Sequence, residues 1–440
     1  MNTIRSGMRL SGCSAAMLAL LALGHADRAS AATRLVTNCN DHGLGSLRHM
    51  VKIAASGDTV DLQNIDCRRI DLSNGEIAVP QSDLTIVGPG RHDLTIDGNR
   101  LGRIFSHTGT GTLRISSLSI TRGYFFDEDW ARGGCIYSMG DVELRRARVS
   151  FCYAIAESDD SSFVTGSGGG VYAKDVLLWH SSVWSSEGSG YGGFGGGVYA
   201  SGRLTLYHAQ LYRNYNSEGG GAAAGSVTAT ASVIRDNRAY RAGGLSVFGR
   251  LMLQQSTVSG NIASACAGGL CVYGSERSVI TGSTISNNST YENASGISSF
   301  DLAVFNSTIA FNASGLCGGA LQAHRLHAES TIIAGNTGNN ACTVGTGVDV
   351  YGDLQFGDTV VGARNLIGTS TIPLPADTIR SDPRLAPLAD NGGPTLTHAL
   401  LSDSPAIDKG SNLLDLLYDQ RGPGYPRVNG RRADIGAFER

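Results

Sequence analysis

A short pattern of apolar and polar positions recurs nine times between about residues 113 and 336. Each copy has two apolar residues two positions apart, then a small residue, another apolar residue and, in most copies, an Asn. Clear copies span residues 203–214, 250–261 and 301–312. The last apolar positions form a column whose steps are 23 to 34 residues long: Ile120, Val149, Val183, Leu211, Ile234, Val258, Ile285, Ile309 and Ile333.

This spacing predicts short strands stacked in a solenoid. Apolar residues two positions apart follow the alternation of a β-strand, in which neighbouring side chains point to opposite faces. A repeat of roughly 20–50 residues indicates that each unit buries its apolar face against the next unit. Gly pairs between the copies provide corners. The predicted fold is all-β, a right-handed parallel β-helix of about 24-residue coils, the step that recurs most often in the column.

The Asn that ends most copies forms a second column. Asn tolerates left-handed backbone, and its amide can bond both to the main chain and to the Asn of the next coil. We therefore interpret the column as a structural ladder of stacked amides and not as a row of ligands. Its members are Asn214, Asn237, Asn261, Asn288, Asn312 and Asn336.

The ends of the chain differ from the repeat. Residues 1–31 have a basic start, an apolar stretch and an Ala-Ser-Ala cleavage motif, which predicts a cleaved signal peptide and an exported protein. Residues 32–75 are expected to form an N-terminal cap, with a short helix capped by Ser46, and the first coil. Residues 76–370 are the coils. Residues 371–440 are rich in turn motifs and predict an irregular C-terminal cap held by a network of charged residues.

Composition narrows the class of protein. The net charge is −3, so the chain lacks the basic field that nucleic-acid binding needs, and we expect no nucleic-acid partner. After the leader no apolar stretch approaches the length of a membrane span. The expectation is a monomer that is extracellular, on the cell surface or periplasmic.

Cysteine usage agrees with export. One of the 9 Cys lies in the leader, which leaves an even number of eight, and an even number in an exported chain indicates disulfides. Pairing in chain order is our prediction among 105 arrangements. The pairs would be Cys39 with Cys67, Cys135 with Cys152, Cys266 with Cys271, and Cys317 with Cys342.

Several motifs resemble a known bacterial group. The opening TN-x-N-D-x-G-x-GSLR, the LTI-x-G strands and the GGGVY corners resemble secreted β-helix proteins of the pectin-lyase-like superfamily. The segments at 381–412, 419–427 and 433–439 are similar to the choice-of-anchor Q domain. The repeats are also similar to passenger domains of polymorphic outer-membrane proteins. An anchoring segment often follows the tail in that family; since the chain stops at Arg440, the resemblance implies free secretion, or periplasmic or loosely surface-bound residence.

Long loops gather at one corner of three early coils, at residues 124–132, 153–167 and 187–194. Insertions in a repeat protein tend to lie on its binding face. Carboxylates there are the candidates for a catalytic pair or for Ca²⁺ ligands, and we otherwise expect no metal or cofactor. The catalytic candidates are Asp127, Asp129, Glu157, Asp159 and Asp160; the Ca²⁺ candidates are Asp127, Asp129, Asp159 and Asp160.

Aromatic residues accompany these loops. One residue past the apolar column, Trp184, Tyr212 and Arg235 are expected to form a vertical file, with a second aromatic pair one face earlier. Flat rings suit the C–H faces of sugars. Ordinary pairing across coils is the alternative explanation. The candidate ligand-binding residues are Trp130, Trp179, Trp184, Tyr191, Tyr212 and Arg235.

Three functional hypotheses follow. The first is a non-enzymatic surface or extracellular protein that binds a polysaccharide or cell-envelope glycan through the long-loop corner. The second is a polysaccharide lyase or glycoside hydrolase. The third is a structural or adhesive rod that contacts proteins. The N-T-D, G-H-G and R-I-K patterns of polygalacturonase-like enzymes are absent from the sequence, which favours the first hypothesis.

Overall fold

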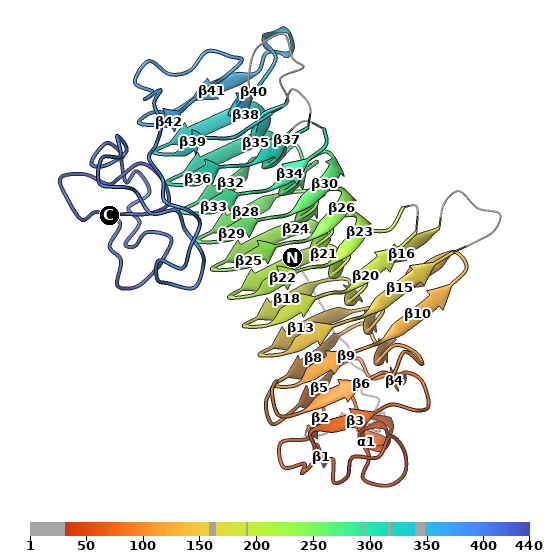
Figure 1. Cartoon of the computed structure of the whole chain (residues 1–440). Coiled ribbons are helices and arrows are strands. Elements are labelled where there is room, and N and C mark those ends of the chain that lie inside the picture. Colours follow the sequence, from red (N-terminus) through yellow and green to blue (C-terminus); the bar gives the residue numbers. More distant parts are fainter. Residues whose placement is uncertain (1–30, 158–163, 191, 293, 316–317, 339–347) are drawn as a thin grey trace, which may run out of the picture.

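The protein folds into a parallel β-helix, as predicted (Figure 1). The computed structural model describes residues 31–440 except 158–163, 191, 293, 316–317 and 339–347. The predicted signal peptide and the predicted pair of Cys317 with Cys342 therefore lie outside the described residues. One full coil shows the plan, with strands β17 (Val171–Ala173), β18 (Val176–Trp179), β19 (Ser182–Trp184) and β20 (Glu187–Ser189).

Equivalent strands of successive coils pair in parallel and build the walls. The largest sheet has 20 strands and covers two adjoining faces, because four long strands bend from one face to the next. Besides β17 and β18 it contains β1 (Thr33–Leu35), β2 (Thr59–Asp61), β4 (Ile77–Val79), β5 (Leu84–Val87), β7 (Phe105–His107), β8 (Thr112–Ser116), β12 (Ile136–Ser138), β13 (Asp141–Arg145), β21 (Val198–Tyr207), β24 (Ala222–Thr230), β27 (Leu245–Val247), β28 (Leu251–Gln254), β31 (Leu270–Val272), β32 (Ser278–Thr281), β35 (Ile297–Phe305), β38 (Leu321–Glu329), β40 (Val350–Tyr351) and β41 (Thr359–Val361).

The next wall is a sheet of 12 strands, which we call the flank sheet. Together with β19 it contains β3 (Arg69–Asp71), β6 (Thr95–Asp97), β9 (Ser119–Thr121), β14 (Arg148–Ser150), β22 (Gln210–Tyr212), β25 (Val233–Arg235), β29 (Thr257–Ser259), β33 (Thr284–Ser286), β36 (Thr308–Ala310), β39 (Ile332–Ala334) and β42 (Leu366–Ile367). The predicted apolar column runs through its centre. Every member from Ile120 to Ile333 pairs with the next in register and is buried.

The remaining wall is a sheet of 8 strands beside a pair of strands at the long-loop corner. The larger one contains β10 (Tyr124–Asp127), β15 (Tyr153–Ala156), β20, β23 (Tyr215–Glu218), β26 (Arg238–Arg241), β30 (Ile262–Ala265), β34 (Ser289–Thr290) and β37 (Ala313–Ser314). The pair consists of β11 (Trp130–Arg132) and β16 (Thr165–Ser167).

The N-terminal end is closed by helix α1 (Leu47–Ile53). The Ser46 hydroxyl accepts a hydrogen bond from the backbone N–H of His49, as the sequence predicts for a helix cap. Leu47 and Val51 are buried over the first coil. A short 3₁₀ turn, η1 (Leu354–Phe356), lies near the other end. Across the described residues no helix is long and apolar enough to cross a membrane.

The Asn column forms the predicted ladder. Each amide donates to the side-chain oxygen of the next Asn at 2.9–3.0 Å, from Asn214 as far as Asn336. The left-handed residue is the one before each Asn and not the Asn itself, for example Arg213 and Asp236 with φ of 56° and 55°. The amide bonds hold the neighbouring corner in this costly backbone conformation.

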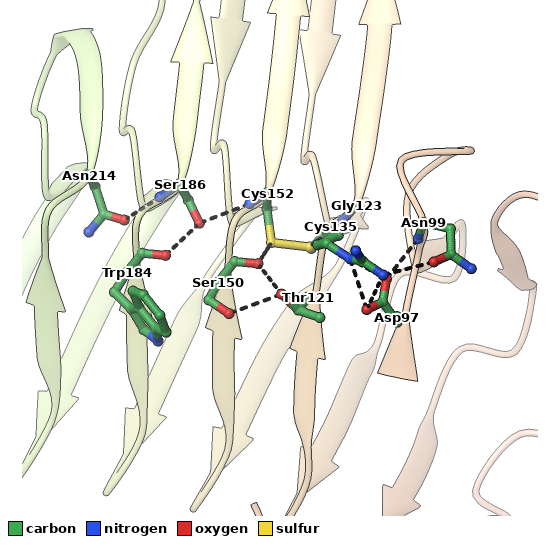
Figure 2. Close-up of a disulfide and its surroundings, with 11 residues drawn as sticks. Asp97, Asn99, Thr121, Gly123, Cys135, Ser150, Cys152, Trp184, Ser186 and Asn214 are labelled. Atoms are coloured by element: carbon green, nitrogen blue, oxygen red, sulfur yellow. Dashed lines mark hydrogen bonds and ion pairs between the residues drawn. A yellow bond between two sulfur atoms is a disulfide. The ribbon is translucent and has the colours of Figure 1, made fainter. Parts of the chain in front are cut away.

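A disulfide continues this column toward the N-terminus (Figure 2). The Asn214 side-chain oxygen accepts from the Ser186 N–H at 3.1 Å, and the Ser186 hydroxyl in turn accepts from the Cys152 N–H at 3.4 Å. Cys152 is bonded to Cys135. The predicted pairs Cys39–Cys67 and Cys266–Cys271 are also formed. Three disulfides place the folded chain in an oxidising environment.

The C-terminal region does more than follow the last coil. Residues 381–440 fold back along the outer face of the flank sheet, drawn as the dark blue chain beside the coils in Figure 1. The contacts are specific: Thr284 donates to Gln420 at 2.6 Å, and the Thr257 hydroxyl donates to the Leu396 carbonyl at 2.7 Å. Ser286 bonds to His398 at 2.7 Å. The region therefore covers strands β29 to β39 from the side.

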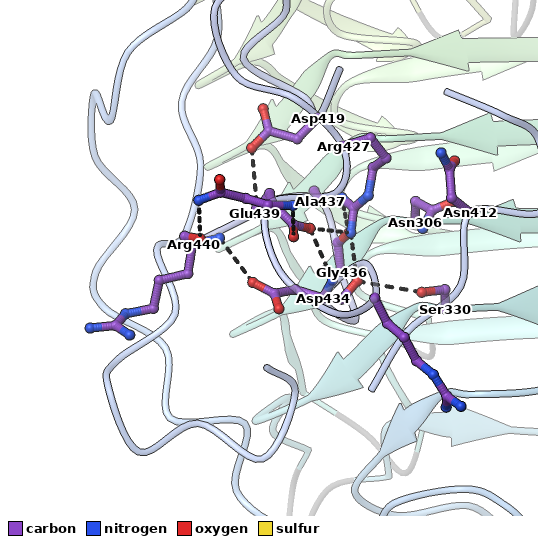
Figure 3. Close-up of polar contacts among 12 residues, drawn as sticks. Asn306, Ser330, Asn412, Asp419, Arg427, Asp434, Gly436, Ala437, Glu439 and Arg440 are labelled. Atoms are coloured by element: carbon purple, nitrogen blue, oxygen red, sulfur yellow. Dashed lines mark hydrogen bonds and ion pairs between the residues drawn. The ribbon is translucent and has the colours of Figure 1, made fainter. Parts of the chain in front are cut away.

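The tail is organised around the buried Arg427, which is 1% exposed (Figure 3). Its guanidinium lies 3.2 Å from the Glu439 carboxylate and donates to the Gly436 carbonyl at 3.0 Å. Asp434 accepts from the Arg440 N–H, and Asp419 accepts from the Glu439 N–H, both at 2.8 Å. The charged residues of the tail thus form the expected structural network.

Breaking the ladder should destabilise the whole fold. In Asn261→Ala the amide and N–H of Asn237 and the carbonyl of Ile234 lose a buried partner. Each buried group without a partner costs about 1–3 kcal/mol, so with three such groups the free energy of unfolding should fall by at least about 3 kcal/mol. Denaturant unfolding measures this. The same change at the exposed turn residue Asn64 should alter stability by less than about 0.5 kcal/mol, and equal effects at both sites would contradict a stabilising ladder.

Acid should weaken attachment of the tail. Burial lowers the pKa of His398, so the folded state resists protonation of this imidazole. Stability is therefore present above the ordinary His value of about 6.5 and is lost as pH falls below it, at up to about 1.4 kcal/mol per pH unit. His398→Gln should show a shallower loss of stability between about pH 6.5 and about pH 5 than the wild type. An identical acid dependence would contradict this role; His42→Gln at an exposed site is the control.

Candidate functional site

The long-loop corner is built mainly of strands. The segment 124–132 forms β10 and β11, and its neighbour in the next coil forms β15 and β16, which pair with them in parallel. Figure 1 shows these strands projecting from the stack. Ala131, Ala154 and Val164 form a small apolar cluster beneath Phe125. The described part of this corner is therefore a packed extension of the β-helix.

The carboxylates of this corner that the structure describes do not converge. The Asp127 side chain accepts from the N–H groups of Asp129 and Trp130, at 3.1 and 2.8 Å, and closes the turn between β10 and β11. These bonds lower the pKa of Asp127, which disfavours it as a general acid. Asp129 and Glu157 are exposed, and Asp159 and Asp160 lie outside the described residues. Within the described ranges no three His, Cys, Asp or Glu residues are grouped to hold a metal.

Two arginines at the corner were not singled out from the sequence. Arg103 is 9% exposed, lies over the Phe125 ring at 3.1 Å and pairs with Glu76 at 3.0 Å. Arg132 lies over Trp130 and Tyr172, at 5.6 and 5.5 Å from the ring centres. Cation–π contacts with these rings hold both guanidinium groups in place. In the sequence, the aromatic residues recur about one coil apart, and this spacing could have pointed to the two arginines.

The predicted aromatic file is present on the flank sheet. The rings of Trp184 and Tyr212 are stacked 5.5 Å apart with an interplanar angle of 2°. The Arg235 guanidinium lies 4.6 Å from the centre of the Tyr212 ring. Val183 and Leu211, which directly precede Trp184 and Tyr212, are buried in the core. Because side chains alternate along a strand, the two rings point outward. The file therefore runs along the outer face of β19, β22 and β25.

A second stack runs beside it, at the corner where each coil enters the flank sheet. Trp179 and Tyr207 lie 6.4 Å apart with an interplanar angle of 7°. His180 and His208 lie 4.7 Å apart with an angle of 3°. The sequence analysis missed the two histidines, although the pattern aromatic-His-x-x-x-aromatic occurs at both 179–184 and 207–212. The same outward side chains thus recur on two consecutive coils.

The flank and the long-loop corner are separate surfaces. Trp179, Trp184, Tyr212 and Arg235 come together on the flank. Trp130 stands on β11, with 56% of its surface exposed, and belongs to the corner. Tyr191 lies outside the described residues. The structure thus brings together most of the predicted aromatic residues and keeps them apart from the acidic ones.

Shallow hollows adjoin the file on the flank sheet. One is lined by Gln210, Val233 and Arg235 together with Asp390 and residues 393–396 of the tail. The turn at 89–91 lines another hollow together with Trp179 and His180. The exposed part of the flank sheet is therefore a groove bounded by this turn at one end and by the tail at the other. The fold and this surface define a class: a disulfide-bonded β-helix with an aromatic groove along one wall.

Comparison with known proteins adds little to this description. No family model matches the sequence, and no curated protein matches it. The resemblance of residues 371–440 to the choice-of-anchor Q domain therefore stays an expectation. Among solved structures the chain is similar to the pectate lyase Pel9A, with 11% identity and a TM-score of 0.38 over 93% of this chain and 97% of that chain. The functional argument rests on the residues themselves.

A calcium titration separates the two roles of Asp127. If Asp127 serves the turn, Asp127→Ala should speed amide hydrogen exchange at Asp129 and Trp130, since both lose their acceptor, and should cost about 1 kcal/mol. Added Ca²⁺ should then leave the melting temperature of the wild type unchanged. A rise in melting temperature with Ca²⁺ that Asp127→Ala abolishes would instead identify a metal site at the corner.

Proposed function

We propose that this protein is an exported, non-enzymatic β-helix protein that binds a polysaccharide or cell-envelope glycan along the flank groove. Trp184 and Tyr212, which stack on each other, would contact the sugar chain with the exposed parts of their rings, and Trp179 would contact the chain where it enters the groove. Arg235 would donate hydrogen bonds to hydroxyl or acidic groups. The long-loop corner, where Trp130 is exposed, is a secondary contact in this proposal.

One observation carries the proposal. Aromatic rings on two successive coils form two stacks with nearly parallel planes, at interplanar angles of 2° and 7°, and the rings of Trp179, Trp184 and Tyr212 are half-buried. Pairing across coils explains a single stack. It does not explain why Trp179 and Trp184 on one coil are followed by Tyr207 and Tyr212 at the equivalent positions of the next coil, which places apolar ring surface at four positions along the groove. Such surfaces suit the C–H faces of a sugar chain.

Export to the cell surface, the extracellular space or the periplasm is part of the proposal. The three disulfides support a compartment in which thiols are oxidised. The leader-like residues 1–31 support export. The motifs of residues 371–440 support a location at the cell envelope or outside it. A β-helix in that setting offers a rigid surface several coils long to an extended polymer.

The test compares binding and turnover on the same polymers. Residues 32–440 would be titrated with a panel of neutral and acidic polysaccharides. Trp184→Ala combined with Tyr212→Ala should weaken binding of the polymer that the wild type retains by at least about tenfold, which corresponds to about 1.4 kcal/mol. The loss is expected because each substitution removes aromatic surface that no neighbouring residue replaces.

Tyr240→Ala is the matched control, because Tyr240 is an exposed ring on β26, away from the groove. Unchanged binding in the double variant would refute the groove as the glycan site. Unsaturated products during the titration would make the protein a lyase, and new reducing ends without them would make it a hydrolase. Either activity would overturn the non-enzymatic part of the proposal.

A further inference from the structure

One part of the groove is a hollow of about 290 Å³ at the corner between β18 and β19 and between β21 and β22. We call it the histidine hollow, because the stacked rings of His180 and His208 form one side of it. Ser182, Gln210 and Tyr212 line its floor, and Pro394 of the tail stands at its edge.

Two arginines reach the histidine hollow from coils nearer the N-terminus. Arg91 belongs to the turn after β5, and its guanidinium donates to the His180 carbonyl at 2.9 Å, although the two residues are 89 positions apart. Arg148 extends from β14, 3.3 Å from the Nδ1 atom of His92. Both side chains line the hollow. The 89–92 turn therefore leans over several coils and carries a positive charge into the groove.

The positive charge of the histidine hollow is not balanced. Within the part of the chain that the structure describes, Arg91, Arg146 and Arg148 form no ion pair with a carboxylate. By contrast, nearby arginines such as Arg145 and Arg235 do have acidic partners. No Asp or Glu is among the described residues that line the hollow, in a protein whose net charge is −3. A local excess of cations on an acidic protein attracts anions.

The remaining lining supplies directional donors. Ser182 and Gln210 provide a hydroxyl and an amide, and the two imidazoles provide ring N–H groups. Burial lowers the pKa of His208, and the charge of the neighbouring His180 lowers it further. The His208 ring is therefore neutral near pH 7 and can donate a hydrogen bond from one nitrogen. Charged guanidinium donors combined with neutral donors are the set that recognises an oxyanion.

We propose that the histidine hollow is a subsite for one oxyanion group, a carboxylate, sulfate or phosphate, carried by the glycan that lies along the groove. Arg91 and Arg148 hold the anion, and Ser182 and Gln210 bind its free oxygens or the adjoining hydroxyls. Tyr212, which lines the hollow and also belongs to the aromatic file, then places the neighbouring sugar on the file. This assignment rests on the proposed function, because it selects acidic polymers among the glycans that the groove would take.

The experiment measures the preference for acidic over neutral polymers. Wild type, Arg91→Gln and Arg148→Gln would be titrated with a uronate-containing, a sulfated, a phosphate-containing and a neutral polysaccharide. Each substitution should weaken binding of the preferred acidic polymer by about tenfold, equal to about 1.4 kcal/mol, and leave the neutral polymer unchanged. The affinity for the acidic polymer should also fall with added salt, less steeply in the variants.

Arg238→Gln is the matched control, because Arg238 is an exposed arginine on β26 of the 8-stranded sheet and its loss changes the net charge equally. It should keep the wild-type preference. The three acidic polymers separate the possible anions, since only the matching one should respond to both substitutions. Equal binding of acidic and neutral polymers by the wild type, or an equal loss for both in Arg148→Gln, would overturn the oxyanion subsite.

Inorganic sulfate and phosphate distinguish failure of this inference from failure of the proposed function. If no polysaccharide binds, the ring signals of His180 and His208 in nuclear magnetic resonance spectra should still shift with either anion in the wild type. They should shift less in Arg148→Gln. That result would keep the anion site while rejecting the glycan-binding function. Signals that do not respond to either anion would overturn the subsite itself.

Discussion

Hydrogen bonding between buried polar groups of successive coils is the constraint on which the rest of the structure depends. The core contains a continuous column of Asn amides, and a parallel column of Ser hydroxyls from Ser232 to Ser307 accepts backbone N–H groups in the same way. Each coil must place its corner directly above the corner of the preceding coil, because otherwise these groups lose their hydrogen-bond partners. Register is therefore fixed by polar satisfaction as well as by apolar packing.

Fixed register is what makes the outer surface chemically ordered. Because equivalent positions of neighbouring coils lie directly above one another, two similar sequences, 179–184 and 207–212, become stacked rings. The same rule stacks Tyr137 on Tyr172 and Tyr172 on Tyr199 on another face, at 5.7 and 4.9 Å. Aromatic pairs alone are thus common in this fold. The flank is distinguished by a hollow that Tyr212 shares with Arg91 and Arg148, neither of which forms an ion pair among the described residues.

Much of the coil architecture could be predicted from the sequence, because each coil repeats the same local rules. The column from Ile120 to Ile333, the Asn ladder, the Ser46 cap and the order of three disulfides all follow from short-range patterns. The path of residues 381–440 could not be read in this way. Its position depends on contacts such as Ser286 with His398, between residues 112 positions apart, and no periodicity marks them. Arg91 escaped notice for the same reason, since its turn reaches coils far along the chain.

The tail also sets the order in which the molecule becomes complete. Residues 393–396 form one end of the flank groove, while the aromatic file comes from strands that precede them by about 160 to 210 positions. A chain folding from its N-terminus, as domains do during synthesis, would finish the coils and expose the rings before that end exists. Residues 393–396, which belong to the tail organised around Arg427, complete that end of the groove. Under the proposed function, a complete binding groove therefore requires a folded C-terminal region.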